Sequence, residues 1–398
     1  MSRNPGAPSV STVATAGRWR PSEAQEMLLE AALGDGAPAD AAFSRWVATT
    51  GFDEIDAGSL RILPLVARRF EQRGVITPWS ALLRGILRRS WYENQVVLHA
   101  TLPAVDVLYA AGIDVAVLKG GSLGAFAYPG IGTRPMDDLD VLVPEERATD
   151  ALGALLGAGW ELGDEGVPAA LHRGEVPVAF RRIRHSTPLY GPGGAEIDLH
   201  WHATYAWCWP GADRGLWTSS RPVELRGRRV RVLSPADELV VACVHGLRPN
   251  AVPPIRWVAD AVVLMESEAV AWDALVDRAR DLRVAPHLVL AFDYLRNRFD
   301  APVPDRVVHA LRSQTPGYFE RRWLSARLDD RPTRTIATHY GGYLRGARAD
   351  TGFRRYAGGL PEHLMYLLGC DAATDVPGEV GRRATARLRR LRRGSPAS

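Results

Sequence analysis

Two aspartates at the start of an apolar run constrain this chain more than any other feature. Asp138 and Asp140 flank Leu139, and the apolar run continues through Val143. Because side chains alternate between the two faces of a β-strand, a strand here would place both carboxylates on one face and the apolar residues in the core. Two carboxylates one strand step apart can chelate Mg²⁺, which prefers oxygen ligands. The pair alone is a weak signal, so its neighbours decide how it is interpreted.

A glycine-rich segment lies upstream of this strand. The apolar residues 115–118 predict a short strand, which leads into Lys119-Gly120-Gly121-Ser122 and a helix expected over 123–128. Backbone N–H groups of glycines at a helix N-terminus can approach phosphate oxygens, so these four residues are predicted to bind a nucleotide. The order differs from GxxxxGK[ST], which disfavours a P-loop kinase or ATPase.

Lys119 is the only lysine among 49 basic residues. The arginine excess is typical of a GC-rich genome, yet this position carries a primary ammonium. Lysine presents a compact point charge, whereas arginine presents a bulky planar group, and the two are not equivalent in a crowded phosphate site. The sequence therefore predicts that Lys119 contacts phosphate.

A third acid lies on a later alternating segment, in which Ile197 and Leu199 flank Asp198. A strand that brought Asp198 beside Asp138 and Asp140 would complete a site of three carboxylates. Such a site can hold two Mg²⁺ ions, one on a triphosphate and one on an acceptor hydroxyl that attacks the α-phosphorus in line. We expect Mg²⁺ as the cofactor, with Mn²⁺ as the alternative.

The order of strand, glycine turn, helix, DxD strand and later Asp strand resembles the DNA polymerase β-like nucleotidyltransferase superfamily. Within it, the segments LKG, RPMDDLDVLV, EIDLHWH, HG and RW..D resemble a poorly characterised nucleotidyltransferase family, over residues 82–290. The resemblance implies an α/β (α+β) core with a small mixed sheet. It also implies metal ligation and catalysis by Asp138, Asp140 and Asp198, and phosphate contacts by Gly120, Gly121 and Ser122. The loop 128–134 is longer than in the smallest members, which leaves the role of Ser122 open.

Other polar residues near these motifs are secondary candidates. Arg134 is predicted to place its guanidinium on the triphosphate, with a surface arginine before a turn proline as the alternative. Asp137 is predicted to face away from the ions. The residues expected to frame a substrate pocket are His200, His245, Arg256, Trp257 and Asp260. Core packing for Trp257 and a surface ion pair for Arg256 and Asp260 are the alternatives.

The alternation of Asp198, His200 and His202 has a rival interpretation. It also fits a zinc cluster or the HxH pair of a metal-dependent hydrolase. Hydrolases with HxH on a strand usually adopt the (β/α)₈ barrel, and this chain lacks its eight strand–helix alternations. We therefore expect His200 and His202 to support the site or to pack.

The chain divides into five segments by pattern and composition. We expect a disordered N-terminus (1–20), an N-terminal helical lobe (21–111), a nucleotidyltransferase core (112–233), a C-terminal helical lobe (234–370) and a basic disordered tail (371–398). Within the core, further strands are expected around 178–184 and 196–202, separated by a glycine-rich turn at 191–194. Ser234, followed by proline, is a strong helix start.

Composition limits the cellular compartment and the classes of partner that we expect. No apolar run approaches the roughly 18 residues of a membrane span, and the N-terminus lacks the apolar core of a signal peptide. The three cysteines lie far apart, which argues against a disulfide framework and fits the cytoplasm. The net charge is +4, and seven arginines between 382 and 393 supply part of it, so a nucleic-acid acceptor is disfavoured.

The predicted function is transfer of a nucleoside monophosphate, AMP from ATP, to a hydroxyl or phosphate of a small molecule, peptide or protein. Three alternatives stay open: a DxD glycosyltransferase, a metal-dependent hydrolase, and a non-catalytic protein that binds a nucleotide or a partner. In glycosyltransferases the DxD normally follows an apolar strand, whereas here it precedes one. A non-catalytic protein would be expected to have degenerate carboxylates, but all three acids are present. The sequence leaves open the acceptor, the preferred nucleotide and the oligomeric state.

Overall fold

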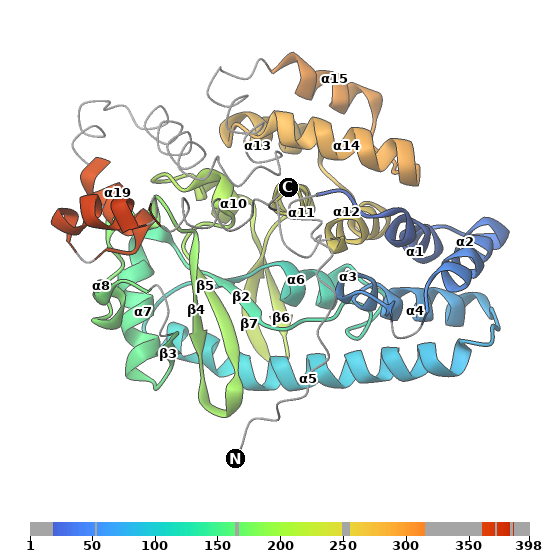
Figure 1. Cartoon of the computed structure of the whole chain (residues 1–398), viewed down its shortest axis with the longest axis horizontal. Coiled ribbons are helices and arrows are strands. Elements are labelled where there is room, and N and C mark those ends of the chain that lie inside the picture. The colour runs from blue at the N-terminus through green and yellow to red at the C-terminus, as the bar shows by residue number, and fades with distance from the viewer. Residues whose placement is uncertain are drawn as a thin grey trace, which may run out of the picture.

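The computed structural model describes residues 19–51, 54–163, 167–248, 255–314, 360–370, 372–382 and 385. A seven-stranded mixed sheet lies among helices from both ends of the chain (Figure 1). The fold is therefore α/β with flanking helices, as the sequence predicts. No helix in the described segments is both long and apolar enough to cross a membrane.

The sheet places the DxD strand near its centre. Its strands are β1 (Ala116–Val117), β2 (Leu139–Leu142), β3 (Glu161–Leu162), β4 (Ser186–Tyr190), β5 (Glu196–His200), β6 (Arg221–Leu225) and β7 (Arg228–Val232). Their order is β3-β4-β5-β2-β1-β7-β6, and only the β2–β5 and β1–β7 pairs are parallel. All four residues of β2 are buried, because β2 has neighbours on both edges and a helix across one face.

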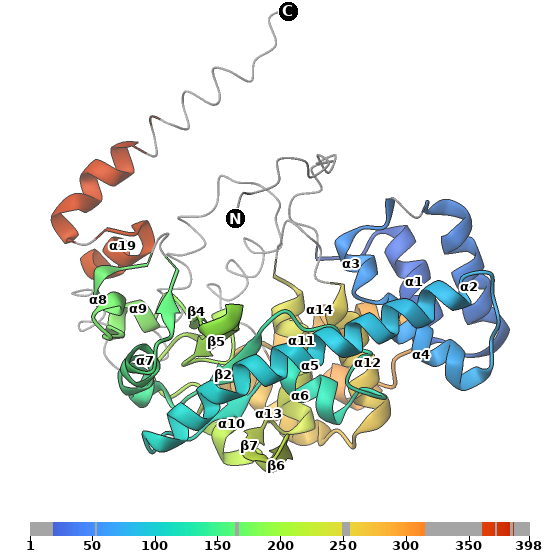
Figure 2. The same ribbon diagram turned by 90° about the horizontal axis from the view of Figure 1, so that it is seen from below.

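The N-terminal helices lead into one long helix that crosses the sheet. They are α1 (Glu23–Leu33), α2 (Gly36–Thr49), α3 (Ala57–Leu60), α4 (Leu63–Arg73) and α5 (Ser80–Ala110). With 31 residues, α5 is about 46 Å long at 1.5 Å per residue. It continues through Pro103 and runs along the underside of the sheet, where it contacts β2 and β5 (Figure 2).

Short helices connect the strands. They are α6 (Lys119–Phe126), η2 (Glu145–Arg147), α7 (Ala148–Gly157), α8 (Ala169–His172), α9 (Val178–Arg181), η3 (Pro192–Gly194), η4 (Tyr205–Trp207) and α10 (Arg214–Ser219). Helix α6 begins at Lys119, earlier than expected, so the glycines form its first turn.

The strand predicted around 178–184 is wrong. Residues 178–181 form the helical turn α9, which follows the extended Pro177 and buries Ala179 and Phe180 on one side. The strand begins only at Ser186, where alternating residues face the core and β4 pairs with β5. The predicted turn at 191–194 is confirmed, since it joins these two antiparallel strands.

The C-terminal helices are α11 (Pro235–Gly246), α12 (Arg256–Ser267), α13 (Trp272–Asp281), α14 (Ala285–Phe299), α15 (Asp305–Ser313), α19 (Leu360–Leu368) and the turn η6 (Ala373–Asp375). The predicted helix start at Ser234 is confirmed, because its hydroxyl accepts a hydrogen bond from the Asp237 N–H at 3.2 Å. Of the expected tail, residues 376–382 are helical, and most of the rest lies outside the described residues.

Two apolar cores hold the molecule together. In one, Leu28 and Trp46 of the N-terminal helices pack in the same cluster as Leu239 and Val258 of α11 and α12. The predicted helical lobes therefore share a core, and α1 lies beside α12 (Figure 1). Trp19, which was expected in the disordered N-terminus, is buried in this core, while residues 1–18 lie outside the described segments.

The second core lies between the sheet and helices α5 and α7. It includes Leu102 of α5, Val141 of β2, Leu152 of α7 and Leu199 of β5. Because apolar residues of β2 and β5 fill this side, the alternating acids of both strands project from the opposite face.

Candidate active site

The parallel pairing of β2 and β5 brings the acids together. Its register sets Asp140 opposite Asp198, with Leu139 opposite Ile197 and Val141 opposite Leu199. Asp138 lies one residue before β2. Burial and the negative charges of Asp140 and Asp198 raise the pKa of the Asp138 carboxyl from 3.8 to about 6. Burial is the largest cause of this rise, and the neighbouring carboxylates add to it.

Lys119 meets these acids from the neighbouring strand. β1 pairs with β2, and the Leu118 N–H donates to the Asp140 carbonyl at 3.0 Å. The chain then turns into α6 through Lys119, whose φ of 47° is unusual for a residue with a side chain. Lys119 Nζ donates to Asp140 Oδ1 at 2.6 Å. Burial would raise the pKa of Asp140, but Lys119 and His200 hold it well below its ordinary value.

The two glycines allow α6 to lie directly against the sheet. A Cβ at Gly121 would lie 2.5 Å from Val117 Cγ1 and 2.6 Å from Leu139 Cδ1. A Cβ at Gly120 would lie 2.9 Å from Arg134 Nη1. No side chain caps the N-terminus of α6, so packing fixes this helix while its first N–H groups keep no capping partner.

His200 links two of the acids. Its Nε2 lies 3.0 Å from Asp140 Oδ1 and 3.0 Å from Asp198 Oδ2, and its Nδ1 lies 3.1 Å from the His202 carbonyl oxygen. Burial alone would lower the pKa of His200, but the Asp198 and Asp140 carboxylates raise it to about 9. The two carboxylates therefore favour the protonated ring, which contacts both acids.

Asp198 keeps one oxygen unused. Ser186 Oγ donates to its Oδ2 at 2.9 Å, whereas Oδ1 is buried without a hydrogen-bond partner in the described part of the chain. Burial would raise the pKa of Asp198, but His200 lowers it to about 2, so the group is ionised. A buried ionised oxygen with no donor is costly unless a cation pairs with it. The three carboxylates and this oxygen fit a divalent cation.

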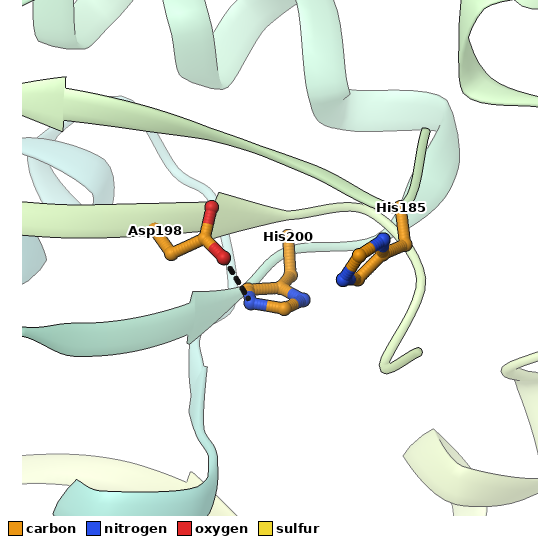
Figure 3. A group of neighbouring side chains, drawn as sticks. All are labelled: His185, Asp198 and His200. Atoms are coloured by element: carbon orange, nitrogen blue, oxygen red, sulfur yellow. Dashed lines mark ion pairs between the residues drawn. The ribbon is translucent and has the colours of Figure 1, made fainter. Parts of the chain in front are cut away.

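His185 belongs to the same site but was not predicted from the sequence. Its ring lies edge-on to that of His200, with 5.2 Å between centroids, and both lie near Asp198 (Figure 3). One ligand atom from each of these three residues lies within 4.8 Å of the others. His185 directly precedes β4, so placing this strand at 178–184 hid it. The same misplacement hid Ser186.

Arg134 and Asp260, predicted to contact substrate, are paired with each other. Arg134 Nε and Nη2 donate to the two oxygens of Asp260 at 2.7 and 2.8 Å, and the Tyr128 hydroxyl donates to Asp260 Oδ1 at 2.7 Å. We call Tyr128, Arg134 and Asp260 the closed cluster. Burial disfavours the charged guanidinium, but Asp260 raises the pKa of Arg134 above its ordinary value. Arg134 Nη1 faces Gly120.

A buried asparagine fixes the loop between α6 and β2. Asn94 of α5 donates to the Arg134 carbonyl at 2.9 Å and accepts from the Met136 N–H at 2.9 Å. This contact joins the long helix to the residues just before the acids. It was not predicted, because an asparagine inside a helix carries no local signal for such a role.

Ser122, predicted to contact phosphate, is turned toward α11. Its hydroxyl donates to Glu238 Oε1, and both side chains are buried. Burial raises the pKa of the Glu238 carboxyl to about 8, although the hydrogen bond from Ser122 opposes this rise. In this arrangement, the side chain of Ser122 helps to anchor α6.

Two of the residues predicted to frame the substrate pocket have structural contacts. Trp257 is 3% exposed and packs against Trp19 and Tyr294 in the helical core, so its alternative as a core residue describes it better. Gly246 makes room for it, since a Cβ there would lie 2.0 Å from Trp257 Cγ. Arg256 Nη1 donates to the Pro135 carbonyl at 2.7 Å and so braces the loop before the acids.

His245, His202 and Asp137 differ in the contacts that their side chains make. His245 Nδ1 is buried without a partner among the described residues, and burial with the charge of Lys119 lowers the pKa of His245 well below its ordinary value. His202 is held by Asp213 at 2.6 Å, so it does not join His200 at the acids. Asp137 is exposed and paired with Arg61, in agreement with the prediction that it faces away.

Comparison with known proteins gives a family match. A family model described as an uncharacterised nucleotidyltransferase matches residues 57–300. No curated protein matches the chain. The crystal structure of an antigenic nucleotidyltransferase-like protein from Paracoccidioides brasiliensis is similar over 56% of this chain and 94% of that one, with 16% identity and a TM-score of 0.34.

Proposed function

Because the chain belongs to the family of uncharacterised nucleotidyltransferases, we propose that it transfers AMP from ATP to a hydroxyl or phosphate of a small molecule, peptide or protein and releases pyrophosphate. The observation that best supports this reaction is the register that sets Asp140 opposite Asp198, with Lys119 Nζ 2.6 Å from Asp140. Acids and a lysine meeting at a helix N-terminus suit a triphosphate and its cation.

Asp138, Asp140 and Asp198 would hold the metal. Mg²⁺ bound there would neutralise the triphosphate and lower the pKa of the acceptor hydroxyl. The unused Asp198 Oδ1 and the raised pKa of Asp138 support this assignment, because both disfavour leaving the acids without a cation.

The phosphates would lie at the start of α6. Lys119 offers an ammonium, and the first N–H groups of the helix have no side-chain cap. Both favour a bound anion. Arg134 would contribute through the N–H groups that Asp260 leaves free, which include both on Nη1. The closed cluster would then hold this guanidinium in one orientation.

His245 is the strongest candidate for contact with the acceptor. Its lowered pKa keeps the ring neutral near pH 7, and Nδ1 has no partner among the described residues. A neutral imidazole nitrogen can accept a hydrogen bond or a proton from an attacking hydroxyl. We place the reaction in the cytoplasm, in keeping with the few, widely spaced cysteines.

Nucleotide binding provides the test. The protein is dialysed to equilibrium with each labelled nucleoside triphosphate, with and without Mg²⁺, and pyrophosphate release is followed with candidate acceptors. We expect Mg²⁺-dependent binding, strongest for ATP, that is lost in Asp138→Ala. Asp137→Ala is the matched control, because Asp137 is the neighbouring aspartate but is exposed and paired with Arg61.

Three results would contradict the proposal. One is the absence of binding of any triphosphate to the wild-type protein, or binding that Asp138→Ala leaves unchanged. Tight binding of a sugar nucleotide instead would favour the glycosyltransferase. Stoichiometric zinc with hydrolysis and no pyrophosphate would favour the hydrolase.

A further inference from the structure

His200 presents a ring nitrogen at the centre of the acidic site. Its Nδ1 lies 3.1 Å from the His202 carbonyl oxygen, which can only accept a hydrogen bond, so Nδ1 carries a hydrogen. Metal-bound histidines typically make this contact, because it orients the ring and directs the other nitrogen at the ion. Nε2 is the nitrogen that faces Asp140 and Asp198.

The spacing of these atoms also suits ligands of one ion. Nε2 lies 3.0 Å from an oxygen of each acid. Adjacent ligands of an octahedral ion with bonds of about 2.1 Å lie about 3.0 Å apart. Hydrogen bonds from an imidazolium explain these two distances equally well, so other atoms must distinguish the two interpretations.

Two further observations are explained by a metal but not by hydrogen bonds. Asp198 Oδ1 is buried without a partner in the described segments. His185 makes ring contacts with His200 and Tyr205, but none of the hydrogen bonds described for the chain involves its ring. A ring nitrogen of His185 nevertheless lies within 4.8 Å of ligand atoms of Asp198 and His200, and Figure 3 shows the three side chains as neighbours. A cation among them would give the His185 ring a partner and would place a positive charge beside the Asp198 carboxylate.

We propose that the acidic site is a mixed carboxylate–imidazole site, in which His200 and His185 supply nitrogen ligands beside the aspartates and favour Mn²⁺ over Mg²⁺. The inference rests on the proposed function, because it concerns the metal of the same site. Mg²⁺ strongly prefers oxygen and keeps its waters, whereas first-row transition ions accept imidazole nitrogen. Among these ions, Mn²⁺ is also suited to carboxylates and phosphates.

Pulsed electron paramagnetic resonance of bound Mn²⁺ tests this directly. The full chain is loaded with Mn²⁺ without nucleotide, in a buffer free of nitrogen ligands, so that any ¹⁴N coupling comes from the protein. We expect imidazole ¹⁴N coupling in the wild type and its loss or reduction in His200→Gln. Mn²⁺ affinity should fall at least about tenfold in this variant, with Mg²⁺ affinity nearly unchanged.

Two more variants keep the result interpretable. His185 is only partly buried, so His185→Gln should fold even if the buried His200→Gln does not, and it should weaken the ¹⁴N coupling. His309→Gln, an exposed histidine on α15, should leave the spectrum unchanged.

The proposal is overturned if the wild type binds no Mn²⁺, binds it without ¹⁴N coupling, or binds Mg²⁺ as tightly. Any of these results, with Mg²⁺-dependent ATP binding retained, would leave the proposed function standing. Bound Mn²⁺ with ¹⁴N coupling but no triphosphate binding would support the mixed site and contradict the proposed function.

Discussion

Two charged clusters flank the first turn of α6, and they differ in how completely their polar atoms are paired. In the closed cluster, both oxygens of Asp260 accept from Arg134, and one also accepts from Tyr128. The open cluster consists of three acids, Asp138, Asp140 and Asp198, with the two cations Lys119 and His200. It has more acids than cations and one buried oxygen without a described partner.

This difference is the one expected between a structural charge cluster and a ligand site. A buried ion pair with every group satisfied fixes a geometry, and removing one partner leaves a buried charge. A cluster with surplus charge and perturbed pKa values typically marks a ligand site. Both clusters contact the first turn of α6. The closed cluster can therefore fix the position of this turn relative to the acids of the open cluster.

The largest expected effect is on the stability of the closed cluster. Asp260→Ala would leave the Arg134 guanidinium and the Tyr128 hydroxyl buried without their acceptor. We expect the free energy of unfolding to fall by about 3–5 kcal/mol, measured by urea denaturation. Asp137→Ala breaks an exposed pair and should cost no more than about 1 kcal/mol. Similar losses in the two variants would show that the closed cluster is not structural.

The next effect concerns binding at the open cluster. Asp140→Asn removes the carboxylate that faces Asp198, and we expect Mg²⁺-dependent ATP affinity to fall at least about 100-fold in equilibrium dialysis. Its loss of stability should be smaller than that of Asp260→Ala, since the amide still accepts a hydrogen bond. If Asp140→Asn unfolds the chain more readily than Asp260→Ala, the contrast between the clusters fails.

Lys119→Arg tests the only lysine. The charge is kept, but a planar guanidinium replaces a compact ammonium beside Asp140 and the helix start. We expect ATP affinity to fall about tenfold, with unfolding free energy changed by less than about 1 kcal/mol. Equal affinity in the variant would mean that arginine serves as well there.

The smallest effect is a pH trend from Asp138. Its pKa is about 6 in the folded chain and ordinarily 3.8, so the folded state holds this proton more tightly. The contribution of Asp138 to stability is therefore lost as pH rises from about 4 to about 6, and it is constant above that range. Relative to wild type, Asp138→Asn should gain stability across that window, measured by urea denaturation at several pH values. Asp137→Asn, a substitution at the exposed neighbouring aspartate, is the matched control.

Some of the site followed from local pattern. The alternation around Asp140 and around Asp198 predicted a strand at each position, with the acid on one face and its apolar neighbours on the other. Both strands are present in the structure. The helix start at Ser234 followed from its cap. Strand β4 could not be placed as reliably, because the apolar residues near 180 suit a helical turn equally well. His185 was missed for the same reason.

By itself, the sequence determined which side chains share a face, because strand and helix periods are set by neighbours along the chain. It also identified Lys119 as a candidate, because a single lysine among so many arginines can be recognised from composition alone. Only the tertiary structure decided that Asp198 lies opposite Asp140 and that Arg134 pairs with Asp260. These pairings join residues far apart in sequence, and the packing of helices and strands, which no local pattern encodes, sets their register and their partners.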